Sequence, residues 1–177
     1  MTDGIANMSL HSLGQMALIS ARLNDSELIY AASSKFVKQH LGTNMFGYGW
    51  NVGSTFQMDG SLVFPAALTE MLVYSRPGII EFLPALPDKL PKGSVTGMLC
   101  RGRIEIKYLQ WDMSRGTVNV VLTSAVTQTI TVKLPKEIDS IKVTKGGGGL
   151  AKSPLGKKYW KLSLPANDTV TLAIALK

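Results

Sequence analysis

The sequence of 177 residues has little cysteine, few aromatic residues (7%) and few charged residues (18%). The single cysteine, Cys100, excludes a disulfide bond within the chain. No segment approaches the ~18 uninterrupted apolar residues that a transmembrane helix needs, so we expect no membrane span. Residues 1–4 lack the charged and apolar regions of a secretory signal peptide. The hydrophobic content of 45% and the mean hydropathy of +0.14 predict a folded chain, either one ordinary domain or two small ones.

Acidic residues are fewer than basic ones, which gives a net charge of +7. A nucleic-acid interface usually shows a basic stripe with interleaved aromatic residues. Here the lysines are instead spread over residues 133–161, on expected strand edges and loops. Lysine commonly protects exposed strand edges from pairing with other chains. We therefore interpret the positive charge as solvated surface and expect no nucleic-acid partner.

Two chemical motifs are present only in incomplete form. Residues 146–153 (Gly-Gly-Gly-Gly-Leu-Ala-Lys-Ser) approach a phosphate-binding loop, but Ala151 stands where glycine is needed. Pro154 follows, and the strand-like pattern resumes where a helix would have to begin, so a flexible hairpin loop is expected. His11 and His40 have no second ligand at metal spacing. The sequence therefore predicts neither a metal site nor a cofactor.

The first third of the chain has helical periodicity. We expect a first helix capped by Asp3 and a second helix capped within residues 24–26 that ends near Gly42. A third helix is expected over residues 62–75, with Pro65 in its first turn, where proline is tolerated. Apolar residues cover most of the circumference of these helices, so they need packing partners on several sides.

From Ile79 onward, apolar and polar residues alternate. Three clear examples are residues 104–108, 130–134 and 170–176. Seven or eight such short segments, separated by turn signals, predict an antiparallel β-sandwich. The fold class is therefore α+β, with a helical segment over residues 1–77 and a β-sandwich domain over residues 78–177.

Three motifs occur in a characteristic order. They are Phe-Gln-Met-Asp-Gly at 56–60, Gly-Ile-Ile-Glu-Phe-Leu-Pro-Ala-Leu-Pro at 78–87 and Gly-Ser-Val-Thr-Gly-Met-Leu-Cys-Arg-Gly at 93–102. Over residues 15 to 124 this order resembles the C-terminal end of glycoside hydrolase family 95, the α-L-fucosidases and their α-L-galactosidase-like relatives. Members of that family are several times longer. The resemblance therefore implies the last helices of an α/α barrel followed by the terminal β-sandwich.

The resemblance also implies candidate site residues. Asp59 aligns with the aspartate that serves as general base in an inverting mechanism, where two carboxyl groups flank the scissile bond. In the family, the general acid and two asparagines that assist the base lie upstream, and nothing in this chain stands for them. Gln57 is a candidate sugar-binding neighbour, and Trp50 is a candidate for stacking on a sugar ring. Glu70 also matches a family position, where we expect a structural hydrogen-bond partner.

Other residues near the first motif depart from the family pattern. Where the family has Asn-Phe-Gly after Asp-Gly, this chain has Ser-Leu-Val at residues 61–63. Where the family has His-Pro-Pro before the motif, this chain has Val-Gly-Ser-Thr at residues 52–55. Because these changes fall on the substrate side of Asp59, the resemblance leaves the sugar open. Trp111 and Trp160 lie in strand patterns and are expected to pack in the core or at an edge. Cys100 is expected to be a buried strand residue.

The expected function is thus that of a C-terminal glycoside hydrolase fragment for terminal α-L-fucosides or related sugars, inactive as this chain alone. The alternatives are a non-catalytic carbohydrate-binding or structural β-sandwich module and a degenerate remnant of the enzyme. The expected partners are a carbohydrate substrate and either a second copy of the chain or the missing remainder of the barrel. Such a partner should cover the apolar faces around Leu13, Met16, Leu28 and Phe36. The resemblance suggests an extracytoplasmic location.

Overall fold

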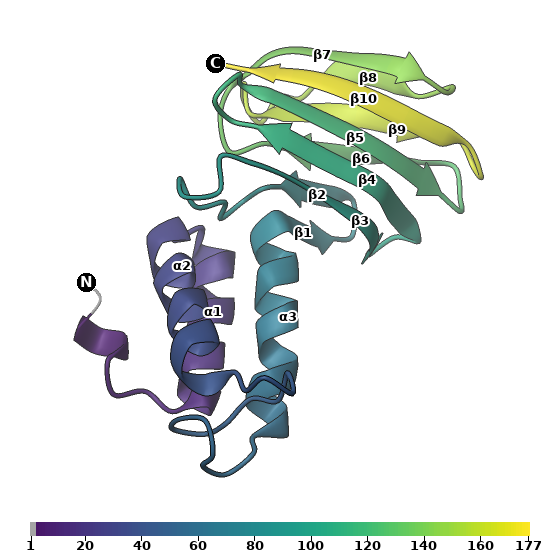
Figure 1. The fold of residues 1–177 in the computed structure, drawn as a ribbon. Helices are drawn as coiled ribbons and strands as arrows, with labels where there is room; N and C mark the ends of the chain where they lie inside the picture. The colour runs from purple at the N-terminus through teal and green to yellow at the C-terminus, as the bar shows by residue number, and fades with distance from the viewer. Residues whose placement is uncertain (1–2) are drawn as a thin grey trace. The chain divides into compact units, whose positions relative to one another are not determined.

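The computed structural model describes residues 3–177 and gives only the backbone of Asp3. The chain divides into two compact units (Figure 1). The first, called here the helical unit, comprises Met1–Leu72 and Pro84–Asp88. The second, the β-unit, comprises Val73–Leu83 and Lys89–Lys177. The predicted order of helices followed by a β-sandwich is confirmed.

The helical unit contains three α-helices and two shorter helical turns. They are a 3-10 turn at Asp3–Ile5, α1 at Leu10–Leu23, α2 at Ser26–Lys35, a π-helical turn at Phe36–His40 and α3 at Met58–Leu72. The first helix begins after Ser9, so the predicted cap at Asp3 is wrong. The predicted cap of the second helix is confirmed, because the Asp25 carboxylate accepts a hydrogen bond of 3.0 Å from the Leu28 backbone N–H.

The third helix occupies a different range from the one predicted. It starts early because the Gln57 carbonyl accepts hydrogen bonds from the Ser61 backbone N–H (3.1 Å) and the Ser61 hydroxyl (2.7 Å). Pro65 therefore lies inside the helix instead of in its first turn, contrary to the sequence prediction. The predicted last turn is also wrong, since Val73–Arg76 pairs with Ile79–Phe82 as a strand. β-Branched and aromatic residues such as Val73 and Tyr74 favour a paired strand over a helix end.

The helices bury a common apolar core. The buried side chains are Ile5, Leu10, Leu13, Ala17, Ala21, Ile29, Ala32, Phe64, Ala67, Met71 and Ala85. Phe36 stacks on Phe64 with ring centroids 4.2 Å apart. Leu13 is thus fully buried, and Met16, Leu28 and Phe36 pack against the same core. The helical unit itself covers the apolar face that was predicted to bind a partner. The predicted position of the partner surface is therefore wrong.

The β-unit has ten strands in two five-stranded sheets. One sheet has the order β1-β2-β6-β9-β8 and the other β3-β4-β5-β10-β7. The strands are β1 Val73–Arg76, β2 Ile79–Phe82, β3 Lys92–Cys100, β4 Ile104–Asp112, β5 Thr117–Ser124, β6 Gln128–Lys133, β7 Ile138–Lys145, β8 Gly149–Lys152, β9 Tyr159–Leu164 and β10 Thr169–Leu176. The sheets are antiparallel except where β2 pairs with β6 in parallel. β1 and β8 bring the total above the seven or eight strands predicted.

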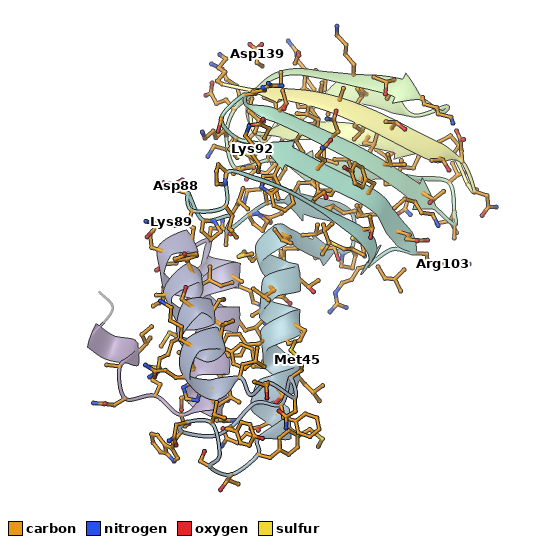
Figure 2. All side chains as sticks on the ribbon, viewed as in Figure 1. Met45, Asp88, Lys89, Lys92, Arg103 and Asp139 are labelled. Atoms are coloured by element: carbon orange, nitrogen blue, oxygen red, sulfur yellow. The ribbon has the colours of Figure 1, made fainter. Side chains whose placement is uncertain are left out.

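Alternation along the strands forms the core of the β-unit. In β10, Val170, Leu172, Ile174 and Leu176 are buried while the residues between them are half-exposed. Charged residues such as Asp139 on β7 project outward from the sheets (Figure 2). Among the described residues, none of the helices combines the length and apolarity needed to cross a bilayer.

Close approach of α1 to α3 depends on glycine. A Cβ atom on Gly14 would lie 2.1 Å from Val63 Cγ1, and one on Gly60 would lie 2.3 Å from Leu10 Cγ. Valine is stiff at χ1 in a helix, so Val63 cannot move away cheaply. The helices can therefore pack at this distance only because Cβ is missing at both positions.

We expect Gly14→Ala to destabilise the helical unit. Overpacking against Val63 costs about 1–3 kcal/mol, and we expect this cost to exceed the gain of up to about 1 kcal/mol from replacing a helical glycine. Gly4→Ala is the control, because nothing lies within 4 Å of a Cβ there. Urea unfolding followed by far-ultraviolet circular dichroism measures both. If Gly14→Ala were as stable as the parent, α1 and α3 could move apart without loss of stability, which would contradict the prediction.

Candidate functional site

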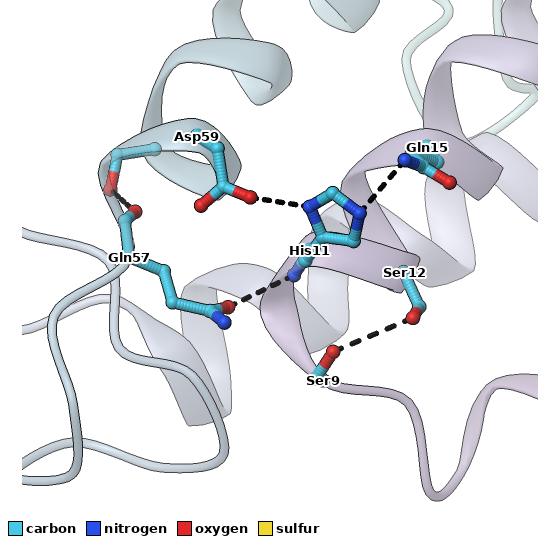
Figure 3. Close-up of polar contacts among 7 residues, drawn as sticks. Ser9, His11, Ser12, Gln15, Gln57 and Asp59 are labelled. Atoms are coloured by element: carbon cyan, nitrogen blue, oxygen red, sulfur yellow. Dashed lines mark hydrogen bonds and ion pairs between the residues drawn. The ribbon is translucent and has the colours of Figure 1, made fainter.

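Asp59 lies in the first turn of α3, and its side chain is 56% exposed. Its Oδ2 atom is hydrogen-bonded to Nδ1 of His11, which lies in the first turn of α1 (Figure 3). The pair spans 48 residues of sequence and is possible because glycine lets α1 and α3 approach closely. A carboxylate and an imidazole thus meet where two helices begin.

Gln15 fixes the tautomer of this histidine. Its Nε2 amide lies 2.9 Å from His11 Nε2, one helical turn further along α1. With the Gln15 amide in this orientation its –NH₂ donates, so His11 Nε2 accepts and Nδ1 carries the proton. His11 therefore donates its Nδ1–H to the Asp59 carboxylate.

The environment of Asp59 favours its ionised form. The hydrogen bond from His11 is the largest cause, followed by the Gly60 backbone N–H, and together they hold the pKa of Asp59 below its ordinary value of 3.8. Helix N-termini also attract negative charge. Asp59 is accordingly a carboxylate at neutral pH.

Gln57 connects the loop before α3 to the start of α1. Its Oε1 atom accepts the His11 backbone N–H at 3.1 Å, and the Gly49 carbonyl accepts the Leu10 backbone N–H at 2.7 Å. These bonds satisfy two of the unpaired donors at the helix N-terminus. They also explain why α1 begins at Leu10. The Oε1 atom of the Gln57 side chain is thus already hydrogen-bonded. A role of Gln57 in binding a sugar stays a prediction.

The loop over residues 42–57 exposes an unusual amount of apolar surface. Trp50 is 65% exposed, and its indole ring has no stacking partner among the described residues. Phe46 and Phe56 pack against each other, with ring centroids 5.1 Å apart. Met45, labelled in Figure 2, and Val52 are also exposed. Trp50 therefore lies on the same loop that leads to Asp59, in a position open to a ligand, and its binding role stays a prediction.

Other residues considered from sequence have structural roles. Glu70 accepts two hydrogen bonds from the Arg22 guanidinium, at 2.6 and 2.9 Å, which joins α3 to α1 and confirms a structural partner. Trp111 is buried and donates its indole N–H to the Leu90 carbonyl at 3.0 Å. His40 is fully buried with Nδ1 2.9 Å from the Tyr48 carbonyl. Burial raises the pKa of the Cys100 thiol, which makes it a poor nucleophile.

The structure adds His11 and Gln15 to the residues inferred from sequence. Sequence reasoning considered His11 only as a metal ligand, and no group of three or more His, Cys, Asp or Glu side chains that could hold a metal occurs in the described part of the chain. The spacing of His11 and Gln15 places both on one helical face, but no local signal points to Asp59, 48 residues away.

Comparison with known proteins identifies the family. The model of the glycoside hydrolase family 95 C-terminal domain matches residues 74–172. The chain belongs to this family. Asp59 lies outside the matched range, so its role does not follow from the match.

One curated relative and two solved structures illustrate the extent of the similarity. The family 95 chain is 34% identical over 111 residues to Alpha-L-fucosidase 2 of Arabidopsis thaliana. That match covers 55% of this chain and 13% of the relative, so the chain spans only a small part of the relative's length.

Both solved structures are remote. The catalytic domain of GH30 xylanase C from Talaromyces cellulolyticus is 19% identical with a TM-score of 0.28, covering 70% of this chain and 26% of that one. The GH127 beta-L-arabinofuranosidase Ara127N-Se from Geobacillus Stearothermophilus T6 is 11% identical with a TM-score of 0.34, covering 93% and 41%. Both likenesses are too weak to indicate a shared architecture.

We expect His11→Gln to raise the pKa of Asp59 toward 3.8, because the largest cause of its lowered pKa is removed. Ser12→Ala, an exposed change one residue further along α1, should leave that pKa unchanged. Nuclear magnetic resonance titration of the Asp59 carboxyl carbon measures it directly. An unchanged Asp59 pKa in His11→Gln would show that the pair does not form in solution.

The same variants test the dependence of stability on pH. A folded-state pKa below the unfolded value stabilises the protein above the ordinary carboxyl pKa, and this stabilisation is lost as pH falls through the folded-state value. The free energy of unfolding of His11→Gln should therefore fall less than that of the parent between neutral pH and the acid range below 3.8. An identical acid dependence in both proteins would contradict this.

Proposed function

We propose that this chain is the C-terminal segment of an inverting glycoside hydrolase that acts on terminal α-L-fucosides or related sugars, with Asp59 as the general base. Family 95 membership supports the hydrolase class, and the matched Arabidopsis thaliana protein is an alpha-L-fucosidase by name. The observation that carries the role of Asp59 is an exposed carboxylate that His11 keeps ionised at the start of α3. A general base must be ionised to accept a proton.

In an inverting reaction, the base takes a proton from water on the face of the sugar opposite the leaving group. A carboxylic acid about 6.5–9.5 Å away protonates the leaving oxygen. In this proposal His11 holds the Asp59 carboxylate in one orientation through its Nδ1–H, and Gln15 holds His11. The acid comes from the part of the protein that precedes these residues in the longer family members.

Substrate and partner contacts are assigned to the same surface. Trp50 offers an exposed aromatic face for C–H contacts with a sugar ring, and the Gln57 amide nitrogen offers a donor. Exposed apolar residues of the loop and α3, such as Phe46, Met58 and Leu62, require a covering partner. The preceding part of the α/α barrel is the proposed partner. A second copy of the chain is the alternative.

A second candidate function is a non-catalytic carbohydrate-binding or structural module. It is favoured by the fact that Asp59 and Gln57 both bind the first turn of α1, which accounts for them without any chemistry. In that case Asp59 serves to join α3 to α1, and the β-sandwich carries the function.

The isolated chain should hydrolyse aryl α-L-fucosides negligibly. General acid–base groups contribute about 10²–10⁴-fold each, and the resemblance assigns the acid to a part of the protein outside these residues. The assay compares the purified chain with its Asp59→Asn variant. Robust turnover that Asp59→Asn abolishes would show that the chain is self-sufficient.

In a longer protein that contains this segment, Asp59→Asn should lower kcat by about 10²–10⁴-fold with little change in KM. Asp139→Asn, an exposed change on β7, is the control and should leave both unchanged. Proton spectra of the sugar first released should show inversion at the anomeric carbon. Full activity of Asp59→Asn would favour the non-catalytic module, and release with retained configuration would exclude the base role.

A further inference from the structure

The β-unit contains an open cavity of about 840 Å³ at one end of the second sheet. Four adjacent strands contribute to it: the end of β3, the start of β4, the end of β5 and the start of β10. Small-molecule sites in proteins usually have volumes of about 300–1,000 Å³. The cavity is therefore large enough for a saccharide of a few units, and every residue that lines it belongs to the β-unit.

Hydrogen bonds between the turns hold the rim of the cavity. The Arg103 carbonyl accepts the Ala125 backbone N–H at 3.0 Å, and the Ser124 carbonyl accepts the Asn167 backbone N–H at 2.7 Å. The Gln128 amide donates to the Gly102 carbonyl and to the Ser124 hydroxyl, both at 2.7 Å. These bonds connect three turns that are distant in sequence. The backbone of the three turns is thus held in place before any ligand arrives.

Two arginines give the cavity an uncompensated positive charge. Arg101 and Arg103 are exposed, and no ion pair involves either guanidinium among the described residues. Lys107 also lines the cavity but is paired with Glu105 at 2.6 Å. Figure 2 labels Arg103 at the turn between β3 and β4. A guanidinium binds carboxylate or sulfate oxygens through two parallel hydrogen bonds.

The rest of the lining suits a sugar better than a nucleic acid. Asn167 and Thr169 offer side-chain amide and hydroxyl groups that can bond to sugar hydroxyls, and Leu99, 83% exposed, offers an apolar surface. Single-stranded nucleic acids are bound mainly by stacking of bases on aromatic side chains. Within the described residues, the lining of this cavity includes no aromatic side chain.

Backbone conformation at Arg103 is consistent with this role. Its φ is +61°, a left-handed conformation that favours glycine or asparagine. Residues other than glycine that are held in this conformation are strained, and they cluster at ligand clamps. An arginine at this position places a guanidinium where a turn alone would favour a smaller residue.

We propose that this cavity binds an anionic saccharide, with Arg101 and Arg103 contacting a carboxylate or sulfate group on the sugar. The site lies wholly in the β-unit, so the inference does not depend on a catalytic role for Asp59. It gives the β-unit of this family 95 chain a carbohydrate-binding activity directed at acidic sugars.

Calorimetric titration of the full 177-residue chain tests the proposal. The probes are trigalacturonate for a carboxylate, a sulfated galactose oligosaccharide for a sulfate ester, neutral galactotriose and a short single-stranded DNA. At least one acidic sugar should bind, with affinity that falls as salt is raised, and the neutral sugar should not. The stronger of the two acidic probes identifies the anionic group.

Two variants and a control locate the binding. Arg101→Gln and Arg103→Asn should each weaken binding of the acidic sugar by about tenfold or more, because each removes a charge-assisted hydrogen-bonding group. Asparagine tolerates the left-handed backbone at position 103. Lys142→Gln makes the same charge change on β7, away from the lining, and should have no comparable effect.

Proton–nitrogen spectra should show ligand shifts concentrated at residues 99–105 and 167–169. Three results would overturn the proposal: no binding of either acidic sugar at millimolar concentration, equal loss of binding in Lys142→Gln, or tighter binding of the DNA than of both sugars. The last result would indicate a general polyanion surface.

Discussion

The contact of α1 with α3 is the constraint on which the helical unit depends. Gly14 and Gly60 leave no Cβ at the point where side chains of the other helix pass, so two apolar faces meet without a gap. The same contact brings His11 to Asp59 and Arg22 to Glu70, one pair at each end of the helices. Packing and polar chemistry in this unit therefore share one cause. A change that separates the helices would disrupt the core and the candidate site together.

The His11 contact has two opposing consequences for a base. It keeps Asp59 ionised, but a carboxylate with a lowered pKa is also a weaker proton acceptor. Exposure to water adds to this, since an ion in water is well solvated. Covering the site with protein and substrate would raise the pKa by desolvation and move it toward the working pH. The proposed remainder of the barrel would thus supply a drier environment as well as an acid.

The β-unit could be predicted more fully from sequence than the helical unit. Alternation in segments such as residues 170–176 predicts a half-buried strand directly, because the pattern and the burial have the same period. The cap at Asp25 was likewise predictable from its own neighbours. The start of α1 was not, because the carbonyl of Gly49 and the side chain of Gln57 satisfy its first N–H groups from another part of the chain. The pairing of His11 with Asp59 was hidden for the same reason.

Exposed apolar residues are concentrated in the helical unit. Of the fourteen large hydrophobic side chains that are exposed in the described residues, eleven belong to the helical unit, although this unit is the smaller one. The core of the helical unit already covers the face around Leu13, so the exposed apolar surface lies elsewhere. Much of it lies on the loop over residues 42–57 and the start of α3, next to Asp59. A surface that is apolar around an ionised carboxylate suits a site enclosed by further protein. If the same carboxylate were open to water on all sides, the apolar residues around it would strengthen its electrostatic interactions little, because water screens charge.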